Sequence, residues 1–161
     1  MTIRRAQFSD APRLIELMQQ AYEKSKYIGR GKVDVTEARE ILIGAMQRDG
    51  VKGPGGTHCM VYEAAAGEVE GFIIGMTERV YHVADKLRAT DIFFYVSDEA
   101  PPLAAGALLK SFEGWATSNK RVIEITLGIT DAIDEPERLA EAYEARGYMR
   151  CGLMLERRVD E

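Results

Sequence analysis

The stretch Asp91-Ile92-Phe93-Phe94-Tyr95-Val96 carries the strongest structural signal in the chain. A short run of apolar, aromatic and β-branched residues predicts a buried β-strand, here over residues 89–96. After a turn at Pro101-Pro102, apolar residues recur at helical spacing and predict a helix over residues 103–118. Because N–H groups at the start of a helix can bind anions, the sequence predicts a phosphate-binding position where this strand leads into this helix.

The elements expected around this pair alternate between strand and helix. Before it we expect a strand over residues 2–6, helices that begin near Ser9 and Asp34, and a hairpin of strands over residues 59–63 and 69–79. After it we expect a strand, a helix and a strand, over residues 122–129, 134–146 and 148–159.

This order predicts the fold class. A strand, two helices, three strands, a helix, a strand, a helix and a strand are typical of an α/β (α+β) fold with helices on both faces of a mixed sheet. We expect six or seven strands in one domain over residues 1–161, with the sheet splayed near Val96. The helix over residues 103–118 should pack across the sheet through Leu108, Phe112 and Trp115.

The bulk composition excludes several classes of partner. The net charge is −5, so the surface should repel the phosphate backbone of nucleic acids. The N-terminus lacks the apolar core of a signal peptide, and no apolar run approaches membrane-spanning length. We therefore expect a cytoplasmic protein that binds neither nucleic acid nor membrane, and the sequence leaves a homodimer open.

Metal-binding and phosphate-loop patterns are also missing. Cys59 and Cys151 are isolated in apolar settings, which is typical of buried small hydrophobic residues rather than of a disulfide or a metal pair. The two histidines, His58 and His82, are too separate to suggest a metal site. The glycine-rich residues 49–57 lack the closing Lys-Ser/Thr pair of a phosphate loop and are interpreted as a flexible connection.

A second pattern lies at the end of the last expected helix, Ala142-Tyr143-Glu144-Ala145-Arg146-Gly147-Tyr148. From helical periodicity alone, Tyr143 is a core aromatic side chain. However, a tyrosine, three residues, a glycine and an aromatic residue, together with the element order and the hairpin over residues 63–77, resemble the GNAT superfamily of N-acetyltransferases. The resemblance covers essentially the whole chain.

The resemblance implies an enzyme that transfers an acetyl group from acetyl-coenzyme A to a primary amine by direct attack. The acceptor would be a small amine, a peptide N-terminus or a lysine, and Tyr143 would be the general acid. Asp91 is the candidate general base, because partial burial at the start of an apolar strand would raise its pKa, although a solvated strand end explains it equally well. Glu78 is a weaker base candidate, and His82 could line the substrate mouth.

The resemblance also implies where the cofactor would bind. The backbone of the strand would pair with the pantetheine amides, and the start of the following helix would hold the pyrophosphate; these positions are Phe94, Tyr95, Val96, Leu103, Ala104, Ala105 and Gly106.

The phosphate loop departs from the family pattern of Arg or Gln, two residues, Gly, one residue, then Gly or Ala. Those positions hold Ala100, Leu103 and Ala105, of which only the last fits. Asp98 and Glu99 precede the loop, and no basic residue lies between residues 88 and 110. The alternative function is therefore a non-catalytic GNAT-like binding or interaction module with weak or no binding of acyl-coenzyme A.

Overall fold

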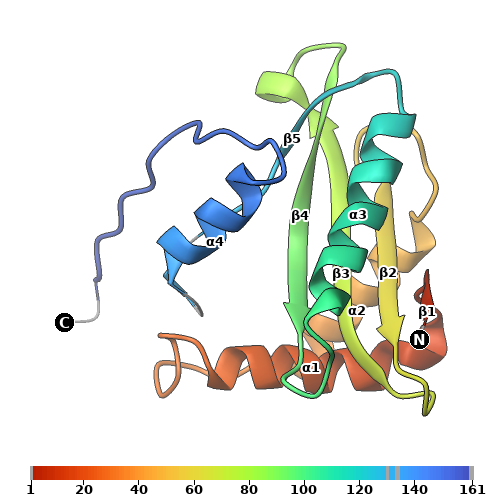
Figure 1. The fold of residues 1–161 in the computed structure, drawn as a ribbon, viewed down its shortest axis with the longest axis vertical. Helices are drawn as coiled ribbons and strands as arrows, with labels where there is room; N and C mark the ends of the chain where they lie inside the picture. The colour runs from red at the N-terminus through yellow and green to blue at the C-terminus, as the bar shows by residue number, and fades with distance from the viewer. Residues whose placement is uncertain (1, 130, 133–134, 160–161) are drawn as a thin grey trace. The chain divides into compact units, whose positions relative to one another are not determined.

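The computed structural model describes residues 2–129, 131–132 and 135–159 of the 161-residue chain (Figure 1). It divides into two compact units, Met1–Gly128 and Ile129–Glu161, and each is described by itself. That the whole chain forms one domain stays a prediction.

The first unit is built on a mixed sheet whose strands lie side by side in chain order. They are β1 (Thr2–Arg5), β2 (Thr57–Glu63), β3 (Val69–Arg79), β4 (Leu87–Val96) and β5 (Val122–Thr126). The first four strands pair antiparallel with their neighbours, and β5 pairs parallel to β4. A parallel neighbour requires a crossover connection, which here is a helix, α3 (Leu103–Ser118).

Helices cover both faces of this sheet, as the sequence predicts. On one face α1 (Ala11–Glu23) and α2 (Val35–Gln47) bury a core with β2, β3 and β4, to which Leu14, Leu42 and Phe72 contribute. On the other face α3 lies across the strands, with α2 behind them in Figure 1. The side chains of Leu108 and Phe112 are fully buried under α3.

Gly75 allows α3 to approach the sheet closely. A Cβ atom added at Gly75 would lie 2.3 Å from Cε2 of Phe112 and 3.3 Å from the ring of Trp115. No real side chain fits at such a distance. The distance between α3 and the sheet is therefore determined by the contact of the Phe112 ring with the backbone of β3 at Gly75.

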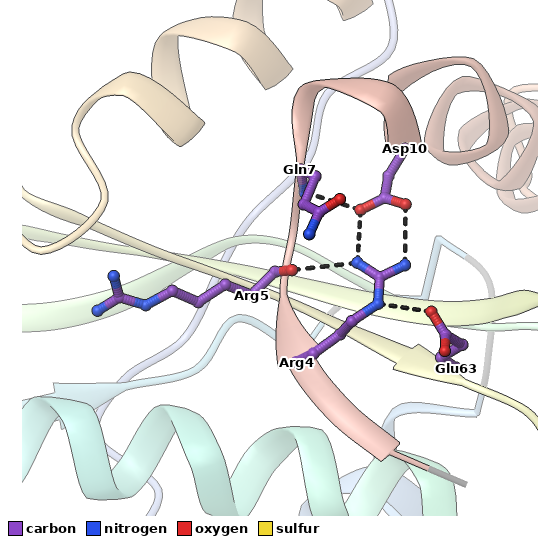
Figure 2. Close-up of polar contacts among 5 residues, drawn as sticks. All are labelled: Arg4, Arg5, Gln7, Asp10 and Glu63. Carbon is purple, nitrogen blue, oxygen red and sulfur yellow. Dashed lines mark hydrogen bonds and ion pairs between the residues drawn. The ribbon is translucent and has the colours of Figure 1, made fainter. Parts of the chain in front are cut away.

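An ion-pair network fixes the start of α1 (Figure 2). Arg4 on β1 donates through Nη1 and Nη2 to both carboxylate oxygens of Asp10, at 2.8 and 3.0 Å, and through Nε to Glu63 on β2, at 2.5 Å. The backbone N–H of Gln7 also donates to Asp10, at 2.7 Å. Burial alone would raise the pKa of Asp10, but the bonds from Arg4 and Gln7 outweigh it and lower the pKa.

The second unit contains one helix among its described residues, α4 (Pro136–Glu144), followed by residues 145–159 without a strand. The prediction of a strand over residues 148–159 is therefore wrong for this structure, and the described residues form a sheet of five strands rather than six or seven. Apolar side chains alternate at Met149, Cys151, Leu153 and Leu155, but a strand also needs a neighbour for its backbone, and none pairs with this segment.

Two smaller expectations concern the same unit. The sequence predicts that Asp134 and Glu137 form a capping pair at the start of this helix, and Asp134 lies outside the described residues. Cys151 is exposed, contrary to the expectation that both cysteines are buried. Cys59 is buried in the core of the first unit, where burial raises the pKa of its thiol to about 12 and makes it unreactive.

Candidate active site

The gap between β4 and β5 is the candidate site. The two strands pair from Leu87 opposite Val122 to Thr90 opposite Thr126, and there the pairing ends. β4 continues to Val96, paired only with β3 among the described strands. The sheet therefore opens after Thr90, not near Val96 as predicted, and residues 91–96 form an open edge.

A β-bulge lies at the start of this open edge. Ile74 on β3 pairs with Phe93, and Gly75 pairs with Asp91, so Ile92 is an extra residue on β4. A bulge bends and twists its strand, which turns β4 away from the direction of β5. Bulges often occur next to active sites, because they redirect side chains at the point where regular pairing stops.

Asp91 lies at this opening. Its Oδ1 accepts a hydrogen bond from the backbone N–H of Gly128, 3.1 Å away, just beyond the end of β5. Burial raises the pKa of Asp91, although the N–H groups of Gly128 and of Asp91 itself act in the opposite direction. A half-buried carboxylate with a raised pKa is suited to accept a proton, as the sequence argument expected.

The two weaker candidates are placed differently. Glu78 accepts a hydrogen bond from Nε of Arg88 at 2.6 Å, across the β3–β4 pair, so its carboxylate is already engaged in an ion pair. His82 ends a short 3₁₀ turn after β3, is exposed, and has a φ of 63°. Neither observation supports a catalytic role.

His58 is the other histidine, and it connects β2 to α3. Its Nε2 lies 3.0 Å from Oγ of Ser111, and its ring stacks on Trp115 with the ring centroids 5.2 Å apart. Burial lowers the pKa of His58; the charge of Asp49 acts in the opposite direction, and the charge of Arg5 lowers the pKa further. No group of three metal-binding side chains exists in the described parts of the chain.

The expected cofactor positions lie on β4 and at the start of α3. The side chain of Tyr95 is buried in the core. A ligand could therefore bind to the backbone of Phe94, Tyr95 and Val96 along the open edge, rather than to the Tyr95 side chain. At the start of α3 no side chain caps the helix, and Ala104 donates its N–H to Pro101 at 2.9 Å.

The side chains in the first turn of α3 leave its end accessible. Leu103, which replaces the family's glycine, is 82% exposed, so its side chain does not fill the space against the sheet. Ala104 is fully buried, Ala105 is half-buried, and a Cβ added at Gly106 would meet nothing within 4 Å. The open edge and the uncapped helix start thus belong to the same unit and follow one another in the chain.

Tyr143 lies in the second unit, where it takes part in the C-terminal cap of α4. Tyr148 donates its N–H to the carbonyl of Tyr143 at 3.1 Å, Gly147 donates to Glu144 at 2.9 Å, and Gly147 has a φ of 96°. This is the Schellman motif, and the Tyr143 and Tyr148 rings, 5.7 Å apart, form its apolar contact. The pattern that carried the family resemblance thus has a structural role, and the catalytic role of Tyr143 stays a prediction.

A polar cavity of about 280 Å³ lies between α1 and the loop after β4, where the sequence predicted no site. Its lining comes from three separate segments: Arg13, Gln20, Glu23, Lys24, Glu70, Ser97, Asp98 and Glu99. Glu70 is buried, and it accepts hydrogen bonds from Arg13 and from the hydroxyl of Ser97. Because these residues are scattered along the chain, no local motif could have identified them.

Comparison with solved structures shows what this arrangement is similar to. An acetyltransferase from Trypanosoma brucei matches with a TM-score of 0.70 and 14% sequence identity, covering 98% of this chain and 99% of that one. A ribosomal-protein-alanine N-acetyltransferase from Brucella melitensis matches with a TM-score of 0.68 and 16% identity, covering 99% of this chain and 100% of that one.

Comparison by sequence gives no match: no protein-family model and no curated protein matches this chain. No helix among the described residues is long and apolar enough to cross a membrane. In fold, with its mixed sheet and helices on both faces, this chain is similar to these two acetyltransferases.

Proposed function

We propose that this protein transfers an acetyl group from acetyl-coenzyme A to a primary amine. The observation that carries the proposal is the open edge of β4 after Thr90, with the Asp91 carboxylate at its start and the uncapped start of α3 at its end. Both acetyltransferases compared above are similar to this chain in fold.

Two features around the gap support the binding of an acyl-coenzyme A. The edge of β4 at Phe94 and Val96 that faces away from β3 pairs with no described strand, so it could offer hydrogen bonds to an amide-containing chain laid along it, as an added strand would. The first turn of α3, with open space at Gly106, offers N–H groups and the positive end of a helix dipole to phosphate groups. Acetyl-coenzyme A supplies the activated acyl group as a thioester.

Asp91 would act on the acceptor. An amine is protonated at neutral pH and must lose a proton before its nitrogen can attack the carbonyl carbon of the thioester. Asp91, whose pKa burial raises, would take this proton while the N–H of Gly128 remains bonded to Oδ1 of its carboxylate. As the C–N bond forms, the C–S bond breaks, and Tyr143 would protonate the leaving thiolate.

An acetylation assay tests this function. Purified protein is incubated with acetyl-coenzyme A and a panel of small amines, peptides with free N-termini and lysine peptides, and release of the free thiol is followed. We expect transfer to at least one class of acceptor, with Asp91→Asn slower by a factor of about 10² or more, the usual contribution of a positioned base. Transfer at equal rates by the variant would remove Asp91 from the mechanism.

The loop before α3 favours one alternative, a non-catalytic binding module. Asp98 and Glu99 are exposed there, and Pro101 and Pro102 lack N–H groups, so the loop is poorly suited to hold a pyrophosphate. A thermal-unfolding assay with acetyl-coenzyme A separates the two functions. Ligand at a hundred times its dissociation constant should stabilise an acetyltransferase by about 2.7 kcal/mol, and the absence of any stabilisation would favour the module.

A further inference from the structure

The charge balance of the loop after β4 leaves a specific problem for the proposed function. Residues 97–102 are Ser-Asp-Glu-Ala-Pro-Pro, and the nearest basic residues in sequence are Arg88 and Lys110. A cofactor with several phosphate groups would therefore meet two carboxylates and no cation from this segment. A phosphate site normally includes a cationic side chain or several aligned N–H groups; the first turn of α3 offers N–H groups, but any cation has to come from elsewhere in the fold.

The structure brings one such cation to the loop. Lys24, at the C-terminal end of α1, places its Nζ 2.5 Å from Oδ2 of Asp98, although the two residues are 74 positions apart. The same Nζ lies 5.7 Å from the centre of the Tyr95 ring on β4. The end of α1 thus delivers an ammonium group to the point where the open edge of β4 passes into the loop.

Lys24 is also the cation of the cavity that can change partner. Arg13 is engaged through all three guanidinium nitrogens, with Val69 at 2.9 Å, Glu16 at 3.0 Å and Glu70 at 3.2 Å. Lys24, in contrast, has an ion pair with a carboxylate side chain that is 81% exposed. Exposed ion pairs contribute about 0 to 1 kcal/mol, so Asp98 can swing into water at little cost.

We propose that Lys24 binds the phosphate groups of the acyl-coenzyme A, and that Asp98 holds this lysine until the cofactor displaces it. The inference rests on the proposed function. It assigns the missing cation to α1 instead of the loop. It also assigns a cause to weak binding: the cofactor has to displace Asp98, and Glu23 and Glu99, which line the same cavity, repel its phosphates.

Calorimetric titration of acetyl-coenzyme A into single variants tests the exchange. Lys24→Gln should weaken binding about 10-fold, the contribution of one hydrogen bond to a charged group. The matched control is Lys32→Gln, an exposed lysine in the connection between α1 and α2, which makes the same change in net charge and should alter affinity by less than about 2-fold.

A second pair of variants tests the role of Asp98. Asp98→Asn should tighten binding by about 3-fold to 5-fold, because it frees Lys24 from an exposed ion pair. Glu99→Gln removes the same charge one residue away, and Glu99 also lines the cavity, but it should tighten binding by less than about 2-fold. The difference in affinity between these two variants measures the release of Lys24, because both remove one negative charge from the same loop.

The possible results separate this inference from the proposed function. If the unaltered protein binds acetyl-coenzyme A and Lys24→Gln binds as well as Lys32→Gln, Lys24 is not the phosphate cation, while the proposed function stands. Equal tightening by Asp98→Asn and Glu99→Gln would overturn the exchange. Binding by Asp98→Asn alone would support it, whereas no binding by any variant would overturn both the inference and the proposed function.

Discussion

The carboxylate of Asp91 accepts a hydrogen bond from the backbone N–H of Gly128, 3.1 Å away, immediately after β4 and β5 stop pairing. The Asp91 side chain thus links β4 to the segment after β5 at the point where the backbones of the two strands no longer pair. The bond fixes the carboxylate at the entrance of the gap. Burial raises the pKa of Asp91, which suits the carboxylate to act as a base. The same burial makes the charged form less favourable and so lowers the stability of the folded protein at neutral pH.

Replacing Asp91 with asparagine should separate these two effects. The amide oxygen still accepts from Gly128, but the buried charge is gone. Because burial raises the pKa of Asp91 in the folded state, the folded protein binds more protons than the unfolded chain between about pH 4 and that raised pKa. The unaltered protein should therefore lose stability as the pH rises through this window, and Asp91→Asn should not.

Urea unfolding between pH 4 and pH 7 measures this difference. The variant should be at least as stable as the unaltered protein at pH 7 while transferring acetyl groups more slowly. The same pH slope in both proteins would contradict the burial of this carboxylate. A loss of stability in the variant at pH 7 would show that the charged form contributes more than it costs.

The network of Arg4 and Asp10 should have the opposite pH dependence. Its contacts lower the pKa of Asp10, so this group stabilises the fold above about pH 4 and loses that contribution as the pH falls through the lowered pKa. Asp10→Asn should destabilise the protein at pH 7 by about 2 to 3 kcal/mol, because the partly buried Arg4 loses the carboxylate that binds Nη1 and Nη2 and keeps only the ion pair of its Nε with Glu63.

Chemical unfolding at pH 7 and pH 3 checks this prediction. The difference between Asp10→Asn and the unaltered protein should shrink markedly at the lower pH. Glu16→Gln is the matched control, since the Glu16 side chain is 60% exposed in its ion pair with Arg13 and should contribute less than about 0.5 kcal/mol. Equal decreases in the free energy of unfolding for the two variants would mean that the Arg4–Asp10 ion pair stabilises the fold no more than the exposed Arg13–Glu16 pair does.

The contact of Gly75 with Phe112 predicts the cost of a single methyl group. Gly75→Ala places a Cβ 2.3 Å from the ring, so α3 or the ring must move, at a cost of about 1 to 3 kcal/mol. Gly114→Ala on the exposed side of α3 meets nothing within 4 Å and should stabilise the helix by up to about 1 kcal/mol. Thermal unfolding of the two variants should therefore shift in opposite directions.

Tyr143→Phe tests the general acid without disturbing the helix cap. The ring that contacts Tyr148 remains, so stability should change by no more than about 1 kcal/mol, the scale of one hydrogen bond. Turnover should fall by a factor of about 10² or more, with little change in affinity for acetyl-coenzyme A. Steady-state kinetics on an acceptor found by screening provides the measurement, and unchanged turnover would leave Tyr143 as a structural residue of the Schellman motif.

The sequence predicted those features whose cause is local. Helical spacing identified α3 and its buried Phe112, and Asp34 accepts hydrogen bonds from the N–H groups of Thr36 and Glu37 at the expected start of α2. The pKa of Asp91 is raised by burial, as one of the two interpretations of the sequence expected, although Asp91 lies in the middle of β4 rather than at the start of the strand.

Features that depend on contacts between distant segments were missed. The bulge at Ile92 and the end of pairing at Thr90 follow from the register of three strands, and an apolar run carries no register. For the same reason the alternating pattern at residues 148–159 predicted a strand without indicating whether a partner exists. The position of Lys24 beside Asp98 depends on how α1 crosses the sheet, which no motif encodes.

The way β5 joins the sheet has a consequence for the order of folding. β2, β3 and β4 form a meander through short turns, whereas β5 reaches β4 only after the chain has closed a loop through the whole of α3. Contacts that close long loops form late, and a short parallel ladder of four residue pairs at the edge of a sheet is weakly protected. We therefore expect amide hydrogens of β5 to exchange with solvent sooner than those of β3, so that the wall of the candidate site opens before the centre of the sheet.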